Sequence, residues 1–305
     1  MRGAILCLGE PLAEFAERGP SDFVASYGGD ISNVAVAIAR QGGRARILSR
    51  VGDDIFGQRL RAFWQAEGVD DALVAVAPGE DTGICFVTYD AAGHHFSYRR
   101  AGSAASRLAP EGLDGAAIAG AGLFYTSGIT LAISRTARAT AERAVELARA
   151  AGVPVAVDPN LRTRLWPLEE ARAVTHALMR RCDIALPGLE DAVQLTGLRE
   201  PAEIVAFYHD LGAGIVALTL GADGVLVSDG VRREALPGLS VATVDATGAG
   251  DCFNGIFLAE YLQTGDPFRA AVLANTGAAL STRGWGAISG IPDRAEVLRH
   301  LPVGQ

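Results

Sequence analysis

Short apolar runs alternate with longer amphipathic runs along most of this chain of 305 residues. The apolar runs have the length of buried strands and stand at residues 4–9, 45–50, 154–158, 184–186, 215–220 and 225–228. The amphipathic runs have helical periodicity and stand at residues 32–41, 55–67, 136–151, 169–181, 202–211, 251–264 and 267–283. This alternation predicts an α/β fold, in which helices cover both faces of a central, mostly parallel sheet. Ligands of such sheets bind beyond the carboxyl ends of the strands.

Residues 82–98 depart from this alternation. They carry strand-like side chains on both sides of an Asp-Ala-Ala-Gly turn at 90–93, which is the pattern of a β-hairpin. Together with the stretch 12–27, this hairpin would form a small β-sheet lid. We therefore predict two units, which are an α/β core made of 1–11, 31–81 and 105–305 and an inserted lid made of 12–30 and 82–104.

The charges and cysteines of the chain narrow its partners and its location. The 27 basic and 35 acidic residues give a net charge of −8, so neither nucleic acid nor an anionic membrane is an expected partner. The uncharged stretch 115–134 is interrupted by glycines, and we expect buried strand and loop there rather than a membrane span. The four cysteines are far apart and form no Cys-x-x-Cys pair, which is typical of reduced, buried residues in a cytoplasmic protein.

All 27 basic residues are arginine, and the sequence contains no lysine. The absence of lysine excludes a P-loop and the strand lysine of protein kinases. It also excludes Schiff-base aldolases and pyridoxal-phosphate enzymes, whose chemistry needs a lysine amine. A phosphate or carboxylate group of a ligand must therefore be held by arginine or by backbone amides.

The segment Asp245-Ala-Thr-Gly-Ala-Gly-Asp251 places small residues, and then a carboxylate, at the start of an expected helix. A ligand can approach the backbone N–H groups closely at the four small residues Thr247, Gly248, Ala249 and Gly250. N–H groups at a helix start form an anion site, because they lack partners within the helix. Asp251 could then accept a proton from a hydroxyl group while the amides hold the charge of a transferring phosphoryl group. The alternative is an ordinary turn in which Asp251 is an N-cap.

A second polar segment, Gly28-Gly29-Asp30-Ile-Ser-Asn33, lies at the start of the helix expected at 32–41, with Ser32 near its cap. Two glycines allow a loop to approach a ligand closely, and the side chains of Asp30 and Asn33 can hydrogen-bond neighbouring hydroxyl groups. This segment therefore predicts a site for a polyhydroxylated ligand. The alternative is a turn followed by an N-cap.

These two segments resemble the motifs of the PfkB family of ribokinase-like sugar kinases, which are Gly-Gly-x-x-x-Asn and Asp-Thr-x-Gly-Ala-Gly-Asp. A third segment, Thr219-Leu-Gly221-Ala-Asp-Gly224, is similar to the Gly-x-x-Gly nucleotide segment of that family, with threonine where lysine is common. The resemblance implies a ribokinase-like fold with a small β-sheet lid, ATP as the phosphoryl donor, Mg²⁺ as a cofactor and Asp251 as the base. It further implies a nucleotide site that includes Thr219, Gly221, Gly224, Thr247, Gly248, Gly250 and Asn275.

Three segments in the middle of the chain resemble 2-keto-3-deoxygluconate kinases, namely Phe96-Ser-Tyr98-Arg-Arg100, Ser127-Gly-Ile-Thr130 and Asp158-Pro-Asn160-Leu-Arg162. The substrate of those kinases carries a carboxylate, which a guanidinium group holds through two parallel hydrogen bonds. We expect Arg100 to bind the substrate with Tyr98 and Tyr89 near it, and Arg162 to bind the substrate or the phosphates. The alternative is that both arginines are exposed surface residues. Alternative functions are a fructokinase or ribokinase that acts on a neutral sugar, and a non-catalytic nucleotide or sugar sensor.

The chain departs from the family pattern at Gly188, where asparagine is expected near the phosphates and Mg²⁺. The neighbouring Glu190 and Asp191 are candidates to hold Mg²⁺ through water, because Mg²⁺ keeps several of its waters in proteins. A monovalent cation is a further candidate cofactor. A projecting lid has exposed strand edges that need covering, so we expect a homodimer formed through the lid, or a higher oligomer.

Overall fold

The computed structural model describes residues 3–19, 21–90 and 93–301. Within them, a nine-stranded sheet has the strand order β13-β12-β11-β10-β9-β8-β1-β4-β5. All neighbours from β11 to β5 pair in parallel, whereas β12 and β13 are antiparallel. The strands are β1 (Ile5–Leu8), β4 (Ala45–Gly52), β5 (Asp70–Ala77), β8 (Leu123–Ser127), β9 (Val155–Asp158), β10 (Ile184–Ala185), β11 (Ile215–Thr219), β12 (Val225–Ser228) and β13 (Arg233–Leu236). The predicted mostly parallel sheet is confirmed.

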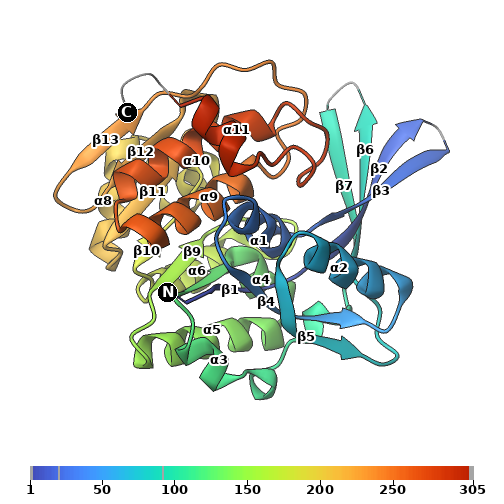
Figure 1. The fold of residues 1–305 in the computed structure, drawn as a ribbon. Helices are drawn as coiled ribbons and strands as arrows, with labels where there is room; N and C mark the ends of the chain where they lie inside the picture. Colours follow the sequence, from blue (N-terminus) through green and yellow to red (C-terminus); the bar gives the residue numbers. More distant parts are fainter. Residues whose placement is uncertain (1–2, 20, 91–92, 302–305) are drawn as a thin grey trace.

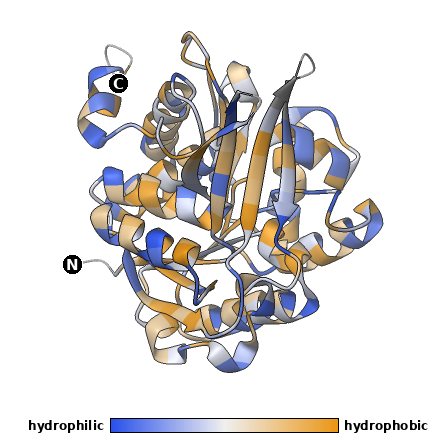
Figure 2. Ribbon diagram, turned by 90° about the vertical axis from the view of Figure 1, so that its right-hand side faces the viewer, coloured by the Kyte–Doolittle hydropathy of each residue, from blue (hydrophilic) through white to orange (hydrophobic). Residues whose placement is uncertain are grey.

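Helices cover both faces of this sheet, and each face has its own apolar core (Figures 1 and 2). The first core includes residues of α1 (Asp30–Arg40), α2 (Ile55–Ala66), α9 (Ala249–Thr264), α10 (Pro267–Ser281) and α11 (Arg294–Arg299). The second includes residues of α3 (Gly115–Ala119), α4 (Gly128–Ile133), α5 (Arg135–Ala150), α6 (Leu168–Met179), α7 (Leu189–Thr196) and α8 (Pro201–Leu211). Strand β1 divides its side chains between them, because Ile5 and Cys7 enter the first core and Leu6 and Leu8 the second.

A second, smaller sheet projects from the side of the molecule (Figure 1) and has the order β3-β2-β6-β7. It consists of β2 (Leu12–Gly19), β3 (Asp22–Gly28), β6 (Ile84–Asp90) and β7 (Gly93–Arg99). The expected hairpin is confirmed, because β6 and β7 pair in antiparallel fashion. Among its described residues, four form a buried apolar cluster, and they are Leu12, Ala16, Cys85 and Val87. We call this sheet the lid; its treatment as a separate unit with the predicted boundaries stays a prediction.

Two local expectations are wrong. The stretch 115–134 was expected to be strand and loop, but it forms α3 and α4 on either side of β8. Helix α1 begins at Asp30 rather than near Ser32, and its N-cap is Gly29, which has a φ of 88°. A Cβ atom at position 29 would stand 2.4 Å from the backbone oxygen of Glu10, so only glycine fits there. Three short 3-10 helices, η1 (Ala105–Arg107), η2 (Pro110–Gly112) and η3 (Gly221–Asp223), lie in connecting loops.

No helix within the described ranges is long and apolar enough to cross a lipid bilayer.

Candidate active site

The loop before α9 is held in a defined shape by Asp245 and Gly248. One Asp245 carboxylate oxygen accepts a hydrogen bond from the Thr247 amide at 2.9 Å, and the other accepts one from the Gly286 amide at 2.9 Å. Gly248 is the N-cap with a φ of 76°, and a Cβ atom there would stand 2.7 Å from Cβ of Ala287. Both the conformation and the close approach therefore require glycine. The amides of Gly250 and Asp251 have no hydrogen-bond partner among the described residues, as an anion site needs, whereas the Ala249 amide donates to the Ala246 carbonyl.

Asp251 lies in the first turn of α9, and Asn33 of α1 donates a hydrogen bond from Nδ2 to its Oδ2 at 2.7 Å. The two helices can bring these side chains together because Gly255, one turn after Asp251, packs directly on α1. A Cβ atom at 255 would stand 2.5 Å from Cβ of Ala37. The N-cap alternative is therefore wrong for Asp251, because Gly248 is the cap and Asp251 contacts another helix. In the second segment the N-cap is Gly29, while Asn33 lies in the first turn of α1 and hydrogen-bonds Asp251.

The surroundings of Asp251 raise its pKa to about 7. The main cause is the loss of water around the carboxylate, and repulsion from the nearby carboxylate of Asp30 adds to it. The hydrogen bond from Asn33 and the positive charge of Arg162 act in the opposite direction and lower the pKa. A carboxylate that gains and loses its proton near neutral pH suits a base in proton transfer.

A cavity of about 410 Å³ opens in front of Asp251, between the lid and the core. Most of the residues predicted to bind substrate line it, and they are Gly29, Asp30, Asn33, Tyr98, Arg100, Arg162 and Asp251. Gly28 stands behind the wall, where a Cβ atom would come within 3.2 Å of Glu14 Oε2. Tyr89 lies at the end of β6, but its side chain is outside the described part of the structure. We call this cavity the sugar cavity, because of the hydrogen-bonding groups that face it.

The two arginines predicted to bind substrate differ in their surroundings. Arg100 is buried, its guanidinium carbon lies 4.8 Å from the centre of the Tyr98 ring, and its Nη2 donates to the carboxylate of Glu10. The surface-arginine alternative is therefore wrong for Arg100. Arg162 is half-exposed, donates to the Leu161 carbonyl at 2.8 Å and stands 3.9 Å from the Asp191 carboxylate.

A second cavity, of about 480 Å³, lies on the other side of the start of α9. It contains the predicted nucleotide residues Thr219, Gly221, Gly224, Gly250 and Asn275. A Cβ atom at Gly250 would meet nothing within 4 Å, so the protein itself does not require glycine there. The open space suits a ligand that approaches the backbone. The amide of Asn275 donates to the carbonyl of Pro237 at 2.8 Å, which fixes its orientation at the cavity wall.

A third cavity, of about 420 Å³, shares the residues from Thr247 to Asp251 with its neighbours and so joins the other two. Asp158 and Asn254 line it together, and Asn254 Nδ2 donates to Asp158 Oδ2 at 2.7 Å. Glu190 and Asp191 line it as well, and Asp191 accepts a hydrogen bond from the Leu161 amide at 2.8 Å. These carboxylates fit Mg²⁺ that is held partly by water. No three His, Cys, Asp or Glu side chains among the described residues form a complete metal site by themselves.

Several residues of the site were not assigned a role from the sequence. Glu10, Ser127 and Asp158 stand at or just after the carboxyl ends of β1, β8 and β9, and Ser127 donates its hydroxyl hydrogen to Asp30. Asn160 follows with a positive φ of 34°, unusual for a residue other than glycine. The signal that could have found them is position, because carboxyl ends of parallel strands are where ligands bind in such sheets.

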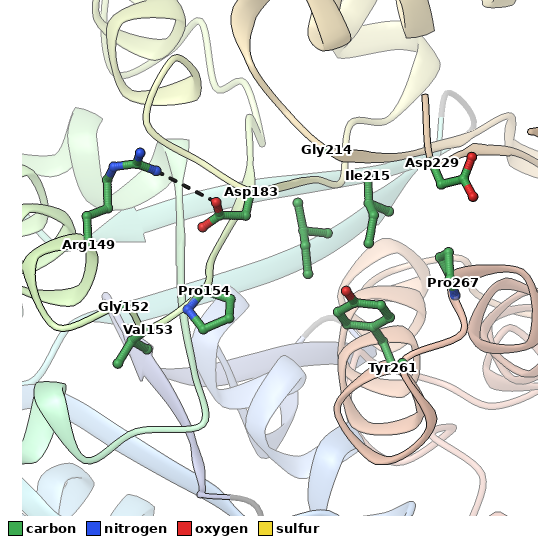
Figure 3. A pocket seen from close by; sticks show the side chains of 12 residues that line it. Arg149, Gly152, Val153, Pro154, Asp183, Gly214, Ile215, Asp229, Tyr261 and Pro267 are labelled. Carbon is green, nitrogen blue, oxygen red and sulfur yellow. Dashed lines mark ion pairs between the residues drawn. The ribbon is translucent and has the colours of Figure 1, made fainter. Parts of the chain in front are cut away.

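A further cavity, of about 550 Å³, lies at the amino ends of the strands of the large sheet (Figure 3). Pro154, Asp183 and Gly214 line it, and they immediately precede strands β9, β10 and β11. None of the residues predicted to bind substrate or nucleotide lines this cavity. The cavities that contain those residues all lie beyond the carboxyl ends, as expected for a doubly wound sheet.

Comparisons with known proteins agree with this arrangement. Residues 7–294 match the model of the pfkB family of carbohydrate kinases. The chain belongs to this family. It is 36% identical to a 2-dehydro-3-deoxygluconokinase of Thermoproteus tenax, over 91% of this chain and 87% of the relative. It is 34% identical to fructokinase-1 of Oryza sativa subsp. japonica, over 92% of this chain and 89% of the relative.

Three solved structures of similar fold cover nearly the whole chain. A PfkB protein of Polaromonas sp. JS666 has a TM-score of 0.89 and 30% identity, over 97% of this chain and 99% of its own. An Escherichia coli protein described as a ribokinase II, in complex with ATP and Mg²⁺, has a TM-score of 0.90 and 25% identity, with coverage of 97% and 98%. A double mutant of Vibrio cholerae fructokinase, with fructose, ADP and potassium bound, has a TM-score of 0.88 and 26% identity, with coverage of 99% and 100%. The predicted ribokinase-like fold is therefore confirmed.

Proposed function

We propose that this carbohydrate kinase transfers the γ-phosphoryl group of ATP to the primary C6 hydroxyl of a sugar acid, 2-keto-3-deoxygluconate. This compound is the same as 2-dehydro-3-deoxygluconate. One observation carries the proposal. The start of α9 stands between the sugar cavity and the nucleotide cavity, with Asp251 at the first and Gly250 at the second. A phosphoryl group that passes between the cavities must therefore cross the amides of residues 247–251.

In the proposed reaction, the hydroxyl oxygen forms a bond to the γ-phosphorus while the bond from that phosphorus to the bridging oxygen of ADP breaks. The hydroxyl proton passes to Asp251 as the new bond forms, because a primary alcohol is too weak an acid to lose it earlier. The first amides of α9 stabilise the charge on the transferring oxygens. Asn33 orients the Asp251 carboxylate through its 2.7 Å hydrogen bond. The lid excludes water, which would otherwise accept the phosphoryl group.

Glu190 and Asp191 would hold Mg²⁺ through water in the joining cavity, near Asp158 and Asn254. When bound, the ion would neutralise part of the phosphate charge. The relatives crystallised with ATP and Mg²⁺ and with potassium support Mg²⁺ and a monovalent cation as cofactors.

The choice of a sugar acid rests on Arg100, which lies buried in the wall of the sugar cavity and can donate to a carboxylate. Glu10 already pairs with this guanidinium group, so the choice also rests on the similarity of the chain to a 2-dehydro-3-deoxygluconokinase. A fructokinase function is the second candidate, because fructokinases are nearly as similar in sequence as 2-dehydro-3-deoxygluconokinases. A non-catalytic sensor is disfavoured by the Asp251 carboxylate and its raised pKa.

The test is ADP release by the purified protein with ATP and Mg²⁺, against a panel of 2-keto-3-deoxygluconate, fructose, ribose and gluconate. We expect the highest kcat/KM with 2-keto-3-deoxygluconate. Preference for fructose or ribose would establish the neutral-sugar alternative. If no sugar leads to ADP release, the kinase proposal is wrong and the non-catalytic sensor is the alternative that fits. A mock purification from host cells that do not express the protein is the control for contaminating kinases, because any ADP release in it comes from another enzyme.

We further propose that the protein forms a homodimer through the lid. Strand β3 is an edge of the lid sheet, and its Phe23 and Val24 side chains are 41% and 50% exposed. Exposed apolar residues on an edge strand favour pairing with another chain. Sedimentation velocity should give a dimer, and Phe23→Glu should shift it toward a monomer; a monomeric wild-type protein would contradict the proposal.

A further inference from the structure

Glu10 and Arg100 form an ion pair at the junction between the core and the lid. Glu10 lies between β1 of the core and β2 of the lid, and Arg100 directly follows β7, the last strand of the lid. The Glu10 side chain is 0% exposed and the Arg100 side chain 9%, so neither charge is compensated by water. A buried carboxylate that loses its partner is strongly destabilised, so Arg100 cannot leave Glu10 ionised and unpaired.

Arg100 already faces two carboxylates before any substrate binds. Its positive charge acts on Glu10 and also on Asp30 of α1. A sugar acid would add a third carboxylate to the same guanidinium group. Three negative charges around one buried positive charge repel one another strongly, because few water molecules screen them. One of the three carboxylates must then be neutralised by a proton.

The other charged and titratable groups around the pair are candidate sites at which this proton could be gained or lost. Tyr98 of β7 and Cys85 of β6 have pKa values raised to about 12 by burial, so both stay neutral at physiological pH. Glu14 of β2 and Asp251 of α9 are further acids on the wall of the cavity, and Arg162 is a half-exposed cation across it. Asp30 accepts a hydrogen bond from the Ser127 hydroxyl on Oδ2 and, like Glu10, has a second buried oxygen without a partner among the described residues. Asp30 is not ion-paired with Arg100, however, so a proton on Asp30 would not release the guanidinium group from Glu10.

Glu10 is the carboxylate best placed to take the proton. Its Oε2 is paired with Arg100, whereas its Oε1 is buried and has no hydrogen-bond partner among the described residues. A proton could therefore be carried on Oε1 without breaking an existing contact. Burial, opposed in part by Arg100, raises the pKa of Glu10 to about 7, so protonation near neutral pH has a low cost in free energy.

We propose that Glu10 takes up a proton from solvent when a carboxylate substrate docks on Arg100, which frees the guanidinium group to pair with the substrate. This inference rests on the proposed sugar-acid function. Glu10 is thus a specificity-determining residue that acts through Arg100 and does not itself line the sugar cavity. Sugar-acid binding is coupled to the uptake of one proton, and the binding of a neutral sugar is not.

Isothermal titration calorimetry with 2-keto-3-deoxygluconate, without ATP, tests this coupling. The titrations use Asp251→Asn as the background, because Asp251 also ionises near pH 7 and would add its own pH dependence. At pH 7.5, two buffers with different ionisation enthalpies should report an uptake of about 0.8 proton per sugar acid bound, from a free Glu10 pKa near 7. The dissociation constant should be about tenfold larger at pH 8 than at pH 6, because the protonated fraction of free Glu10 falls by that factor.

Glu10→Gln in the same background separates this role from a merely structural one. Glutamine keeps the shape and an oxygen for Arg100 but carries no ionisable proton, so uptake and pH dependence should both disappear, with affinity at pH 8 at least equal to that with Glu10 present. Affinity lowered equally at all pH values, with proton uptake retained, would overturn the proposal. Wild-type binding of the sugar acid without proton uptake would overturn it too, while leaving the proposed function intact. No binding or turnover of the acid would refute both, with fructose binding as the check that the cavity is formed.

Discussion

Two carboxylates with a pKa of about 7 belong to the region of the sugar cavity. Asp251 lines the cavity and defines what we call the catalytic end, whereas Glu10 pairs with the lining residue Arg100 and defines what we call the recognition end. At one end Asp251 is hydrogen-bonded to the neutral amide of Asn33. At the other end Glu10 is paired with the positive charge of Arg100. Because one carboxylate is bound to a neutral amide and the other to a cation, we expect proton transfer from the first and substrate recognition from the second. A base held by an amide keeps a carboxylate oxygen available for the proton of a hydroxyl group, whereas a paired carboxylate sets the charge that its cation presents to a ligand.

The two ends also differ in what positions them. The Asp251–Asn33 contact depends on the close approach of α9 and α1 within the core, where Gly255 meets Ala37. The Glu10–Arg100 contact joins the core to the lid, whose described residues form a buried apolar cluster of four. Proton transfer needs fixed geometry, and packed helices supply it. Recognition can tolerate movement, because a lid must open to admit the substrate and close over it.

The largest effect is expected at the catalytic end. Asp251→Asn removes the base but keeps the size of the side chain, so turnover should fall by about 10²-fold or more while sugar binding is largely retained. Single-turnover kinetics together with calorimetric sugar affinity measures both quantities. Near-normal turnover in this variant would show that Asp251 is not the base. The assignment of proton transfer to Asp251 and of recognition to Glu10 and Arg100 would then be wrong.

Arg100→Ala tests the recognition end. The kcat/KM for 2-keto-3-deoxygluconate should fall by about 10- to 100-fold, on the scale of a lost charged hydrogen bond, whereas fructose should be little affected. Arg99→Ala is the matched control, because the neighbouring Arg99 is exposed and does not line the sugar cavity. Thermal unfolding must accompany the kinetics, since the variant leaves Glu10 without its cation. An equal loss with both sugars would assign Arg100 to general stability rather than to carboxylate recognition.

Gly250→Ala tests the nucleotide side of the catalytic end separately from folding. Alanine favours a helix and a Cβ atom at 250 meets nothing within 4 Å, so the melting temperature should stay the same or rise. The added methyl group would nevertheless hinder a phosphate group at the amides, and KM for ATP should rise about tenfold, as for the loss of one charged hydrogen bond. Gly115→Ala, in the first turn of α3 with equally open surroundings, should change stability alone. An unchanged KM for ATP in the Gly250→Ala variant would show that the phosphates of ATP do not bind at the Gly250 amide.

The sequence predicts the catalytic end better than the recognition end, for a physical reason. Gly248 and Asp251 lie within one turn of helix, so local spacing is enough to predict an anion site with a base beside it. The partner of Asp251 is 218 positions away along the chain, and the contact depends on a helix crossing that no local pattern encodes. Glu10 gave no signal of its own, because its partner Arg100 is 90 positions away and on another sheet.

The fold shows the same limit. Strands buried on both faces were predicted, because a continuous apolar run is unambiguous. The edge strand β5 was missed, since its buried residues come at every third position, without the alternation typical of a strand, and it has a neighbour on one side only. The glycine at 29 shows how a backbone contact overrides a side-chain signal. The close approach to Glu10 makes Gly29 the cap of α1 in place of the serine that the sequence favours.

The smallest expected effect is a displacement of the pH profile. Asp251 is active as a base only when ionised, so kcat at saturating sugar and ATP should rise with pH through about 7 and level off above it. The hydrogen bond from Asn33 favours the ionised form, so Asn33→Ala should raise the Asp251 pKa and move this acid limb to higher pH. The displacement should be about one to two pH units, because a hydrogen bond to a charged group contributes about 1.5–3 kcal/mol and one pKa unit corresponds to about 1.4 kcal/mol. Ser32→Ala, a change on the same helical turn without contact to Asp251, should leave the limb in place. A limb that stays fixed or moves to lower pH in Asn33→Ala would mean that Asn33 does not tune the base, and that Asp251 and Glu10 differ in position rather than in chemistry.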